Sequence, residues 1–300
     1  MDMKFRAHET FFIRKGWLSK GIRAVEENPE VFIMKAPMPM DALGIGANMV
    51  KSLRYWMQAT DLTKEPKSGK RIQTFTEFGN LVRKYDRYTE EIGTLYLIHY
   101  KLISNAEKAT SWYYLFNLYQ PVELVKDDFI SSLNGYVISK NGEGAAMRSY
   151  TDDFNCIIGT YVPRYQVEPS KVSPENNIDC PLGELGLITV IDRVKKVYRK
   201  TSPSVDTLDP WVVLAVMMDN LYGRKELSFS FNELLTSPCN IGRVFNMDVI
   251  TMLDVLQRVE RTEAIKIIRT AGLDTVRVLK KYTFNECVEK YYKNIEESRG

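Results

Sequence analysis

Hydrophobic and polar positions separate most clearly in residues 38–62. Ile45, Met49, Leu53 and Trp56 recur at the spacing of one helical face, which predicts an amphipathic helix. Two glycines precede this run and permit a tight turn. The opposite face is polar and comprises Asn48, Lys51, Arg54, Tyr55 and Gln58. The pattern indicates the second half of a helix-turn-helix, and an ordinary amphipathic helix with a solvated polar face is the alternative.

A polar turn follows this helix and changes the balance between the two interpretations. Pro66, Ser68 and Gly69 lie between the helix end and residues 72–75, which have strand propensity, so the turn looks like a wing. Residues 41–85 contain 8 basic and 4 acidic side chains, a local surplus that could neutralise DNA phosphates. We therefore predict an N-terminal winged helix-turn-helix with DNA contacts from Asn48, Lys51, Ser52, Arg54, Tyr55, Lys67, Lys70 and Arg71.

The C-terminal third repeats this order of elements. Helices are predicted over 211–222, 231–235 and 247–261, with Asn246 as the cap of the last one. Two strand-like runs, 264–270 and 273–279, flank Ala271-Gly272 as a hairpin. This order predicts a second winged helix, to which Lys266 and Arg269 would contribute DNA contacts. Winged helices also dock proteins, so DNA contact and protein docking both remain open for this copy.

The remaining segments are mostly helical. Apolar spacing predicts helices over 8–28, 90–103, 111–118, 129–138 and 149–161, a short piece at 30–35 that could be the first helix of the helix-turn-helix, and an exposed connection over 162–179. We predict a mainly α fold with a minor β part. Its domains would be 1–120 (winged helix), 121–205 (helical middle section) and 206–300 (C-terminal winged helix).

Composition limits the function classes. A chain of 300 residues with 44% hydrophobic residues can fill the cores of two domains. Its net charge of +3 means that any affinity for nucleic acid must come from local patches. No secretory signal or bilayer-spanning apolar run is evident, so we expect a cytoplasmic protein without a membrane partner. Four dispersed cysteines and two histidines argue against a zinc site or a disulfide scaffold.

The sequence contains no specific catalytic motif. It lacks the Walker, H-E-x-x-H and G-x-S-x-G patterns. The acid pairs at 127–128 and 152–153, or Glu9, could serve a metal-dependent nuclease, but adjacent acids diverge on a helix and commonly act as surface or cap residues. Cys156 or Cys180 could carry sulfur as a persulfide, and the alternative for both is a small packed side chain. The catalytic residues stay unassigned and no metal ligand is predicted; Mg²⁺ or Mn²⁺ would be the cofactor of a nickase.

Four segments resemble a known family. They are HETFFIRKGWLSKG (8–21), LGIGANMVKSLRYWMQA (43–59), SYTDDFNCIIGTY (149–161) and NNIDCPLGELGLI (176–188). These strings are similar to the domain of unknown function 4007 family, which includes the SspB-like proteins of bacterial DNA phosphorothioation systems. The resemblance implies a role in phage defence, in which sulfur replaces a non-bridging phosphate oxygen of DNA. Its implied partners are double-stranded DNA, a cysteine desulfurase and an ATP pyrophosphatase-like sulfur-transfer protein.

Two functional hypotheses follow. In the first, the protein is the DNA-binding component of a phosphorothioate modification system and nicks DNA to allow sulfur incorporation, which is the activity that the resemblance implies. In the alternative, it is a non-enzymatic DNA-binding adaptor or transcriptional regulator that recruits the sulfur-transfer partners. The first would be an endonuclease and the second would not be an enzyme.

Overall fold

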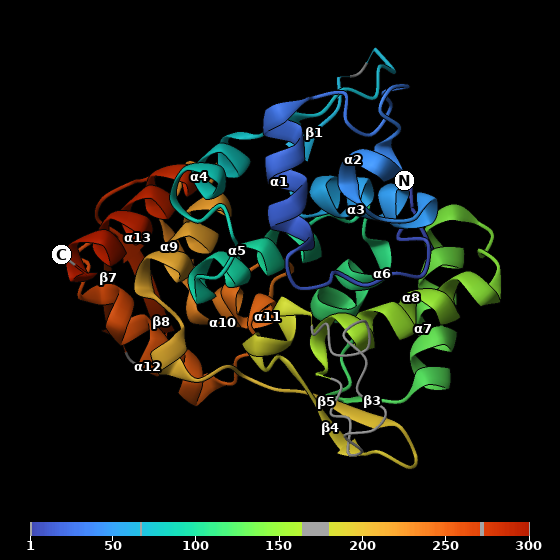
Figure 1. Ribbon diagram of the computed structural model, residues 1–300. Helices are drawn as coiled ribbons and strands as arrows, with labels where there is room; N and C mark the ends of the chain where they lie inside the picture. Colours follow the sequence, from blue (N-terminus) through green and yellow to red (C-terminus); the bar gives the residue numbers. More distant parts are fainter. Residues whose placement is uncertain (1, 67, 164–179, 271–272, 300) are drawn as a thin grey trace. The chain divides into compact units, whose positions relative to one another are not determined.

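The fold is mainly helical with small antiparallel sheets (Figure 1). The computed structural model describes residues 2–66, 68–163, 180–270 and 273–299. Two compact units divide the chain: Met1–Leu115 with Tyr119–Lys200, and Phe116–Leu118 with Thr201–Gly300. The first unit thus combines most of the predicted N-terminal and middle domains, and the second begins five residues before the predicted boundary at 206.

The helices of the first unit are short to medium in length. They are α1 (Trp17–Glu27), α2 (Pro39–Leu43), α3 (Ala47–Ala59), α4 (Glu77–Tyr85), α5 (Ile92–Ile103), α6 (Thr110–Tyr113), α7 (Lys126–Asn141), α8 (Met147–Tyr161) and the 3-10 helix η3 (Pro181–Leu185). A π-helix, η1 (Tyr114–Leu118), crosses from this unit into the second. The core of the unit includes Trp56 and Trp112, and α5 is buried over most of its length.

Two sheets belong to the same unit. β1 (Thr63–Lys64) pairs with β2 (Thr74–Phe75), so the polar segment between them closes a small antiparallel ribbon. β3 (Glu123–Leu124) pairs with β5 (Val197–Lys200), which also pairs with β4 (Ile188–Asp192). The basic run 192–200 therefore contains a tight turn followed by β5. Its exposed side chains lie around the β4–β5 hairpin.

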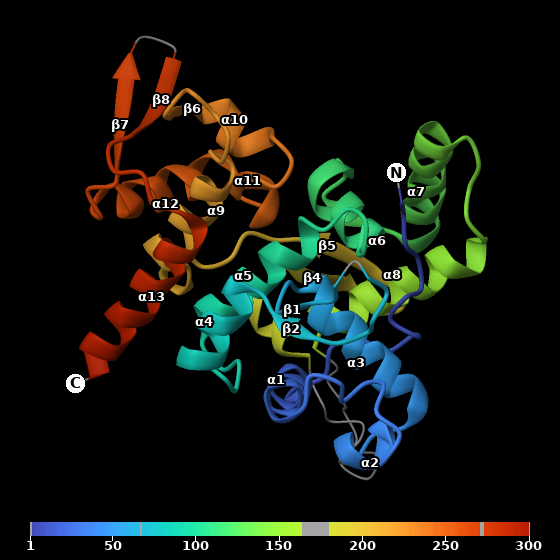
Figure 2. The ribbon, with the colours of Figure 1, turned by 90° about the horizontal axis from the view of Figure 1, so that it is seen from above.

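The second unit has the element order helix, strand, helices, hairpin, helix. It consists of η4 (Val205–Thr207), α9 (Pro210–Asp219), β6 (Ser228–Ser230), α10 (Phe231–Thr236), α11 (Ile241–Val244), α12 (Val249–Glu260), β7 (Ile265–Thr270), β8 (Leu273–Val278) and α13 (Phe284–Arg299). β8 lies between β6 and β7, and all pairs are antiparallel (Figure 2). α9 is packed against α13 and α12, and its residues 212–218 are all buried. The predicted pairing of two strands around residues 271–272 is confirmed, and that turn itself lies outside the described residues.

Several helix starts follow from local capping chemistry. Asp209 accepts a hydrogen bond from the backbone N–H of Trp211 at 2.7 Å, and Pro210 occupies the first helical position. Ser230 and Thr76 cap α10 and α4 in the same way. Pro39 begins α2, where the missing N–H of proline costs nothing.

Three helix predictions differ from the structure. α1 begins at Trp17 rather than near His8, because Gly16 has φ 79° and Arg6, Glu9 and Thr10 also have positive φ. Residues 30–35 form turns instead of a helix, and α2 precedes α3. Asp248, not Asn246, caps α12: its carboxylate accepts from the N–H of Thr251 at 2.7 Å, whereas the Asn246 amide donates to the carbonyl of Thr201.

We predict that Gly79→Ala destabilises the protein by about 1 to 3 kcal/mol, because a Cβ at this position would clash with the carbonyl of Leu62. That carbonyl accepts from the N–H of Thr76 at 3.2 Å, so it is not free to move. Thermal and urea unfolding would measure the loss. The matched control is Gly135→Ala in α7, where nothing lies within 4 Å of the new Cβ and we expect a gain of about 0.5 to 1 kcal/mol. Equal effects of the two substitutions would contradict the steric explanation.

Candidate nucleic-acid interface

Helix α3 is held in place by its apolar side. Leu53, Trp56 and Met57 are fully buried, so this part of the predicted apolar face is confirmed. Ile45 and Met49, at the start of the pattern, are only partly covered. A Cβ on Gly21 of α1 would lie 2.5 Å from the sulfur of Met57, so α1 and α3 approach closely at that glycine. The amphipathic pattern therefore fixes which side of α3 faces outward.

The amino-terminal half of α3 exposes polar side chains. Asn48 and Lys51 are both exposed, and the Lys51 ammonium donates to the Asn48 amide oxygen at 3.3 Å. The turn before the helix uses Gly44 in a left-handed conformation (φ 61°) and Gly46 as the N-cap without a side-chain cap. Asn48 and Lys51 are thus the two predicted DNA contacts on α3 that the structure leaves accessible.

The other predicted contacts on α3 have partners inside the protein. Arg54 forms a bidentate ion pair with Glu65, with N–O distances of 2.6 and 2.7 Å. The Tyr55 hydroxyl donates to the carbonyl of Lys108 at 2.9 Å, and burial raises the pKa of Tyr55 well above its usual value. Ser52, which was also predicted as a DNA contact, is fully buried. The same helical spacing that indicates DNA contact also places side chains against neighbouring segments.

Glu65 organises the junction between α3 and the β1–β2 ribbon. Besides Arg54, the Glu65 carboxylate accepts from the amides of Gln58 at 2.9 Å and Gln73 at 2.5 Å. Gln73 is buried and accepts in turn from the Thr63 hydroxyl at 2.7 Å. Burial alone would raise the pKa of Glu65. The hydrogen bonds from Arg54 and Gln73 and the positive charge of Arg54 outweigh this effect, so the pKa is lowered.

Exposed basic side chains occupy the ribbon beside α3. Lys64 lies on β1, and Lys70 and Arg71 lie in the segment between the strands. Lys70 and Arg71, both predicted from the sequence, are exposed, while Lys67 lies outside the described residues. Together with Lys51, these cations could meet the phosphates of a duplex.

Two lysines near α3 were not predicted from the sequence. The backbone N–H of Lys4 donates to the carbonyl of Glu107 at 3.1 Å, which brings the N-terminal segment beside residue 108. The Lys108 ammonium lies 3.4 Å from the Gln58 amide oxygen on α3. Burial and the nearby Lys4 charge lower the pKa of Lys108. No local signal could have found this pair, because its members are about a hundred positions apart.

The N-terminal segment that carries His8 is a structural support. His8 is buried, and its Nε2 lies 2.8 Å from an oxygen of Asp153. Because Nδ1 accepts from the N–H of Thr10 at 3.0 Å, Nε2 carries the proton that Asp153 accepts. Asp153 also accepts from the Arg6 N–H at 2.7 Å and from the Ser111 hydroxyl at 2.6 Å. Both oxygens of this carboxylate therefore accept hydrogen bonds from the protein.

Two other residues considered for catalysis, Asp152 and Cys156, also have structural surroundings. Asp152 is paired with the Arg6 guanidinium at 2.8 Å, while Asp153 accepts from the backbone N–H of the same residue. Cys156 is buried, and burial followed by the charge of Asp153 raises its pKa well above the usual value, which keeps the thiol protonated. No group of three or more His, Cys, Asp and Glu side chains in the described part of the chain is placed to hold a metal ion.

The predicted contacts in the second unit lie on β7. The Lys266 ammonium is 3.2 Å from the Glu260 carboxylate on α12. Arg269 is exposed and stands opposite Asp274 in the β7–β8 register. Each of these two cations therefore has an acidic neighbour close by.

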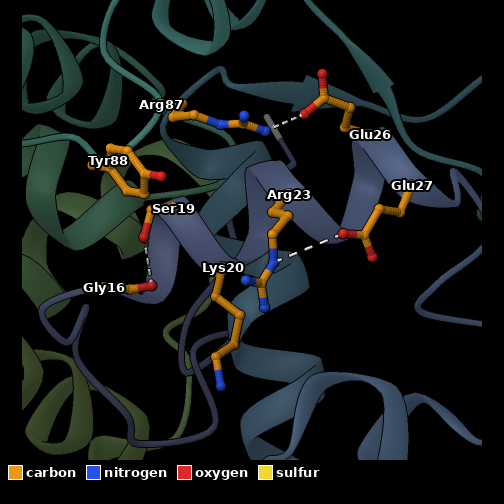
Figure 3. A pocket seen from close by; sticks show the side chains of 8 residues that line it. All are labelled: Gly16, Ser19, Lys20, Arg23, Glu26, Glu27, Arg87 and Tyr88. Atoms are coloured by element: carbon orange, nitrogen blue, oxygen red, sulfur yellow. Dashed lines mark hydrogen bonds and ion pairs between the residues drawn. The ribbon is translucent and has the colours of Figure 1, made fainter.

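A groove of about 650 Å³ runs along α1 (Figure 3). Its cations are Lys20, Arg23 and Arg87, and its acids are Glu26 and Glu27. Arg87 is paired with Glu26 at 2.6 Å, Arg23 lies 3.9 Å from Glu27, and the Lys20 ammonium donates to a backbone carbonyl at 2.8 Å. Two of the three cations are thus paired with the two acids of the groove, and the third, Lys20, contacts a backbone carbonyl.

The described residues thus define a two-unit, mainly helical protein that presents exposed basic side chains on α3 and an adjoining ribbon. Residues 5–292 match the family described as "Protein of unknown function (DUF4007)", and the chain belongs to this family. Two crystal structures of SspB, one with a magnesium ion bound, are similar to the chain at a TM-score of 0.81 and 25% sequence identity. Each similarity covers 99% of this chain and 87% of the SspB chain. The comparison with curated proteins gave no match.

No helix in the described part of the chain combines the length and the apolar character that crossing a bilayer requires.

We predict that Glu65→Gln lowers the free energy of unfolding by about 1 to 2 kcal/mol at pH 7, because it removes a charged, partly buried hydrogen-bond acceptor. The folded-state pKa of Glu65 is lowered, so its stabilisation is present above the unfolded-state value of 4.5 and is lost as the pH falls through the folded-state pKa. Urea unfolding of both proteins from pH 7 to pH 3 would test this. A difference that stays constant over this range would show that the carboxylate charge is not the cause.

Proposed function

We propose that this protein is the DNA-binding component of a DNA phosphorothioation system, and that it binds DNA through α3 and the β1–β2 ribbon. The observation that carries the proposal is the similarity to SspB, which extends over nearly the whole chain. Because the similarity covers nearly the whole chain, it supports a role in the same kind of system as SspB and not only the presence of one common domain. The particular contacts are inferred from the surface of this protein.

The surface of the first unit supports contact with phosphates. Lys51, Lys64, Lys70 and Arg71 are exposed on α3 and the adjoining ribbon. Residues 1–100 contain 16 Lys and Arg against 12 Asp and Glu, so the positive charge of the chain is concentrated in this region. The order α1, α2, α3, β1, β2 is compatible with the winged-helix interpretation, in which α3 would be the recognition helix. We propose this arrangement for the N-terminal segment.

We further propose that DNA nicking is its contribution to the modification, opening the backbone for sulfur incorporation. The proposed partners are the cysteine desulfurase and the ATP pyrophosphatase-like sulfur-transfer protein of the same system. The adaptor function remains the second candidate, and the exposed side of α12 favours it, because that side has little positive charge.

We predict that DNA binding is salt-dependent and that Lys51→Gln and Arg71→Gln each weaken it. Each lost phosphate contact should reduce the slope of log affinity against log salt concentration by about 0.9. Fluorescence anisotropy with a labelled duplex at several salt concentrations would measure this slope. Lys140→Gln, an exposed charge on α7, is the matched control and should leave the slope unchanged. The N-terminal interface would be refuted by unaltered binding in both variants.

We predict that the purified protein converts supercoiled plasmid to open-circle plasmid, because one strand break releases the supercoils. The reaction would be run with Mg²⁺, with Mn²⁺ and with EDTA, and bound DNA would be measured in the same samples. DNA binding without open-circle product under every condition would favour the adaptor over the nickase. Loss of both binding and nicking would argue against the whole proposal.

A further inference from the structure

The amino-terminal end of α12 presents an exposed apolar surface bordered by acids. Ile250 is 73% exposed and Val249 is 49% exposed, high values for large aliphatic side chains at the start of a packed helix. Asp248 and Asp254 are exposed beside them. We refer to Asp248, Val249, Ile250 and Asp254 as the α12 patch.

The α12 patch is held rigidly by the opposite side of the helix. Met252, Leu256 and Val259 are fully buried, and α12 packs against α9 and β7. Asp248 is fixed as the N-cap by its hydrogen bond from the Thr251 N–H. Hydrogen bonding to Thr251 lowers the pKa of Asp248, so this carboxylate is charged at neutral pH. Burying the inner side of α12 leaves Val249 and Ile250 no place in the core.

The charge around the patch disfavours DNA as its ligand. A recognition helix contacts base edges with its amino-terminal residues, which in α12 would bring Asp248 and Asp254 towards the phosphates. Two cations of this region are already paired: Arg258 contacts the Val205 carbonyl and Asp206, and Lys266 contacts Glu260. Arg261 is exposed but follows Asp254 by seven positions, about two helical turns from the amino-terminal end. Residues 201–300 contain 13 Lys and Arg against 14 Asp and Glu, so this unit lacks the positive surplus of residues 1–100.

The same charges disfavour a second copy of the chain. A two-fold contact buries the same surface on both subunits. The patch would then bring the carboxylates of one copy close to those of the other. Like charges across an interface cost binding energy. A surface with aliphatic side chains and an acidic border instead complements one with apolar anchors and a basic border.

We propose that the α12 patch docks a partner protein that presents apolar side chains within a rim of Lys and Arg. Ile250 would be the central anchor, and Asp254 would contact the basic rim. This inference rests on the proposed function only for the choice of partners to test, which are the two sulfur-transfer proteins. It assigns recruitment to the second unit and leaves DNA contact to the first.

The experiment measures binding of the full-length protein to the purified cysteine desulfurase and, separately, to the ATP pyrophosphatase-like protein by biolayer interferometry. We expect at least one of them to bind, and Ile250→Asp and Asp254→Lys each to weaken that binding by about tenfold or more. The matched control is Tyr222→Asp, which changes a side chain that is 91% exposed in the same unit and should have no effect. Circular dichroism melting would verify folding, and both patch substitutions lie at exposed positions.

Three results would overturn the proposal. The first is that neither sulfur-transfer protein binds, or that binding is unchanged in both patch variants. The second is a dimer of the wild-type protein in sedimentation that Ile250→Asp dissociates, which would identify a second copy as the occupant. The third is weaker duplex binding in the patch variants, which would identify DNA. Duplex binding by the wild-type protein is measured in parallel, so failure of this inference is distinguishable from failure of the proposed function.

Discussion

The buried carboxylate of Asp153 on α8 is the interaction on which the arrangement of the first unit depends. It accepts hydrogen bonds from His8, from the Arg6 N–H and from Ser111. These bonds hold a segment in which Arg6, Glu9 and Thr10 have positive φ, a conformation that costs energy for residues with a side chain. A buried charge is tolerated when it is fully hydrogen-bonded, and here the same bonds offset the backbone strain.

The N-terminal segment that Asp153 holds is connected to α3 by hydrogen bonds to a single carbonyl group. The Phe11 carbonyl, three residues after His8, accepts from Trp56 Nε1 at 2.9 Å and from the Ser52 hydroxyl at 3.3 Å. His8 also stacks on the Trp56 ring, with 6.1 Å between ring centroids. The N-terminal segment thus sets the rotation of α3. Arg54 and Tyr55 also contact neighbouring segments, so the outward direction of Asn48 and Lys51 depends on this network as well as on the amphipathic pattern.

Local signals in the sequence predicted the parts of the fold that depend on neighbouring residues. The Asp209-Pro210 helix start, the position of α3 and the β7–β8 hairpin all follow from capping, periodicity or strand propensity within a short window. The Arg54–Glu65 pair and the approach of Lys4 to Lys108 depend on packing between distant segments, and a helical pattern contains no information about them. Ser52 is a different case, because its spacing from Met49 and Trp56 places it on the apolar side of α3, where its hydroxyl donates to a backbone carbonyl.

Helices α3 and α12 occupy comparable places in their own units, before a β-ribbon, yet they differ in what they expose at the amino-terminal end. α3 exposes Asn48 and Lys51, and its ribbon adds Lys70 and Arg71. α12 exposes Val249 and Ile250. Backbone geometry is therefore insufficient to assign a ligand, because a helix before a ribbon suits DNA or protein equally well. The side chains decide, since phosphates require positive charge and an uncharged aliphatic surface gains free energy only when another apolar surface covers it.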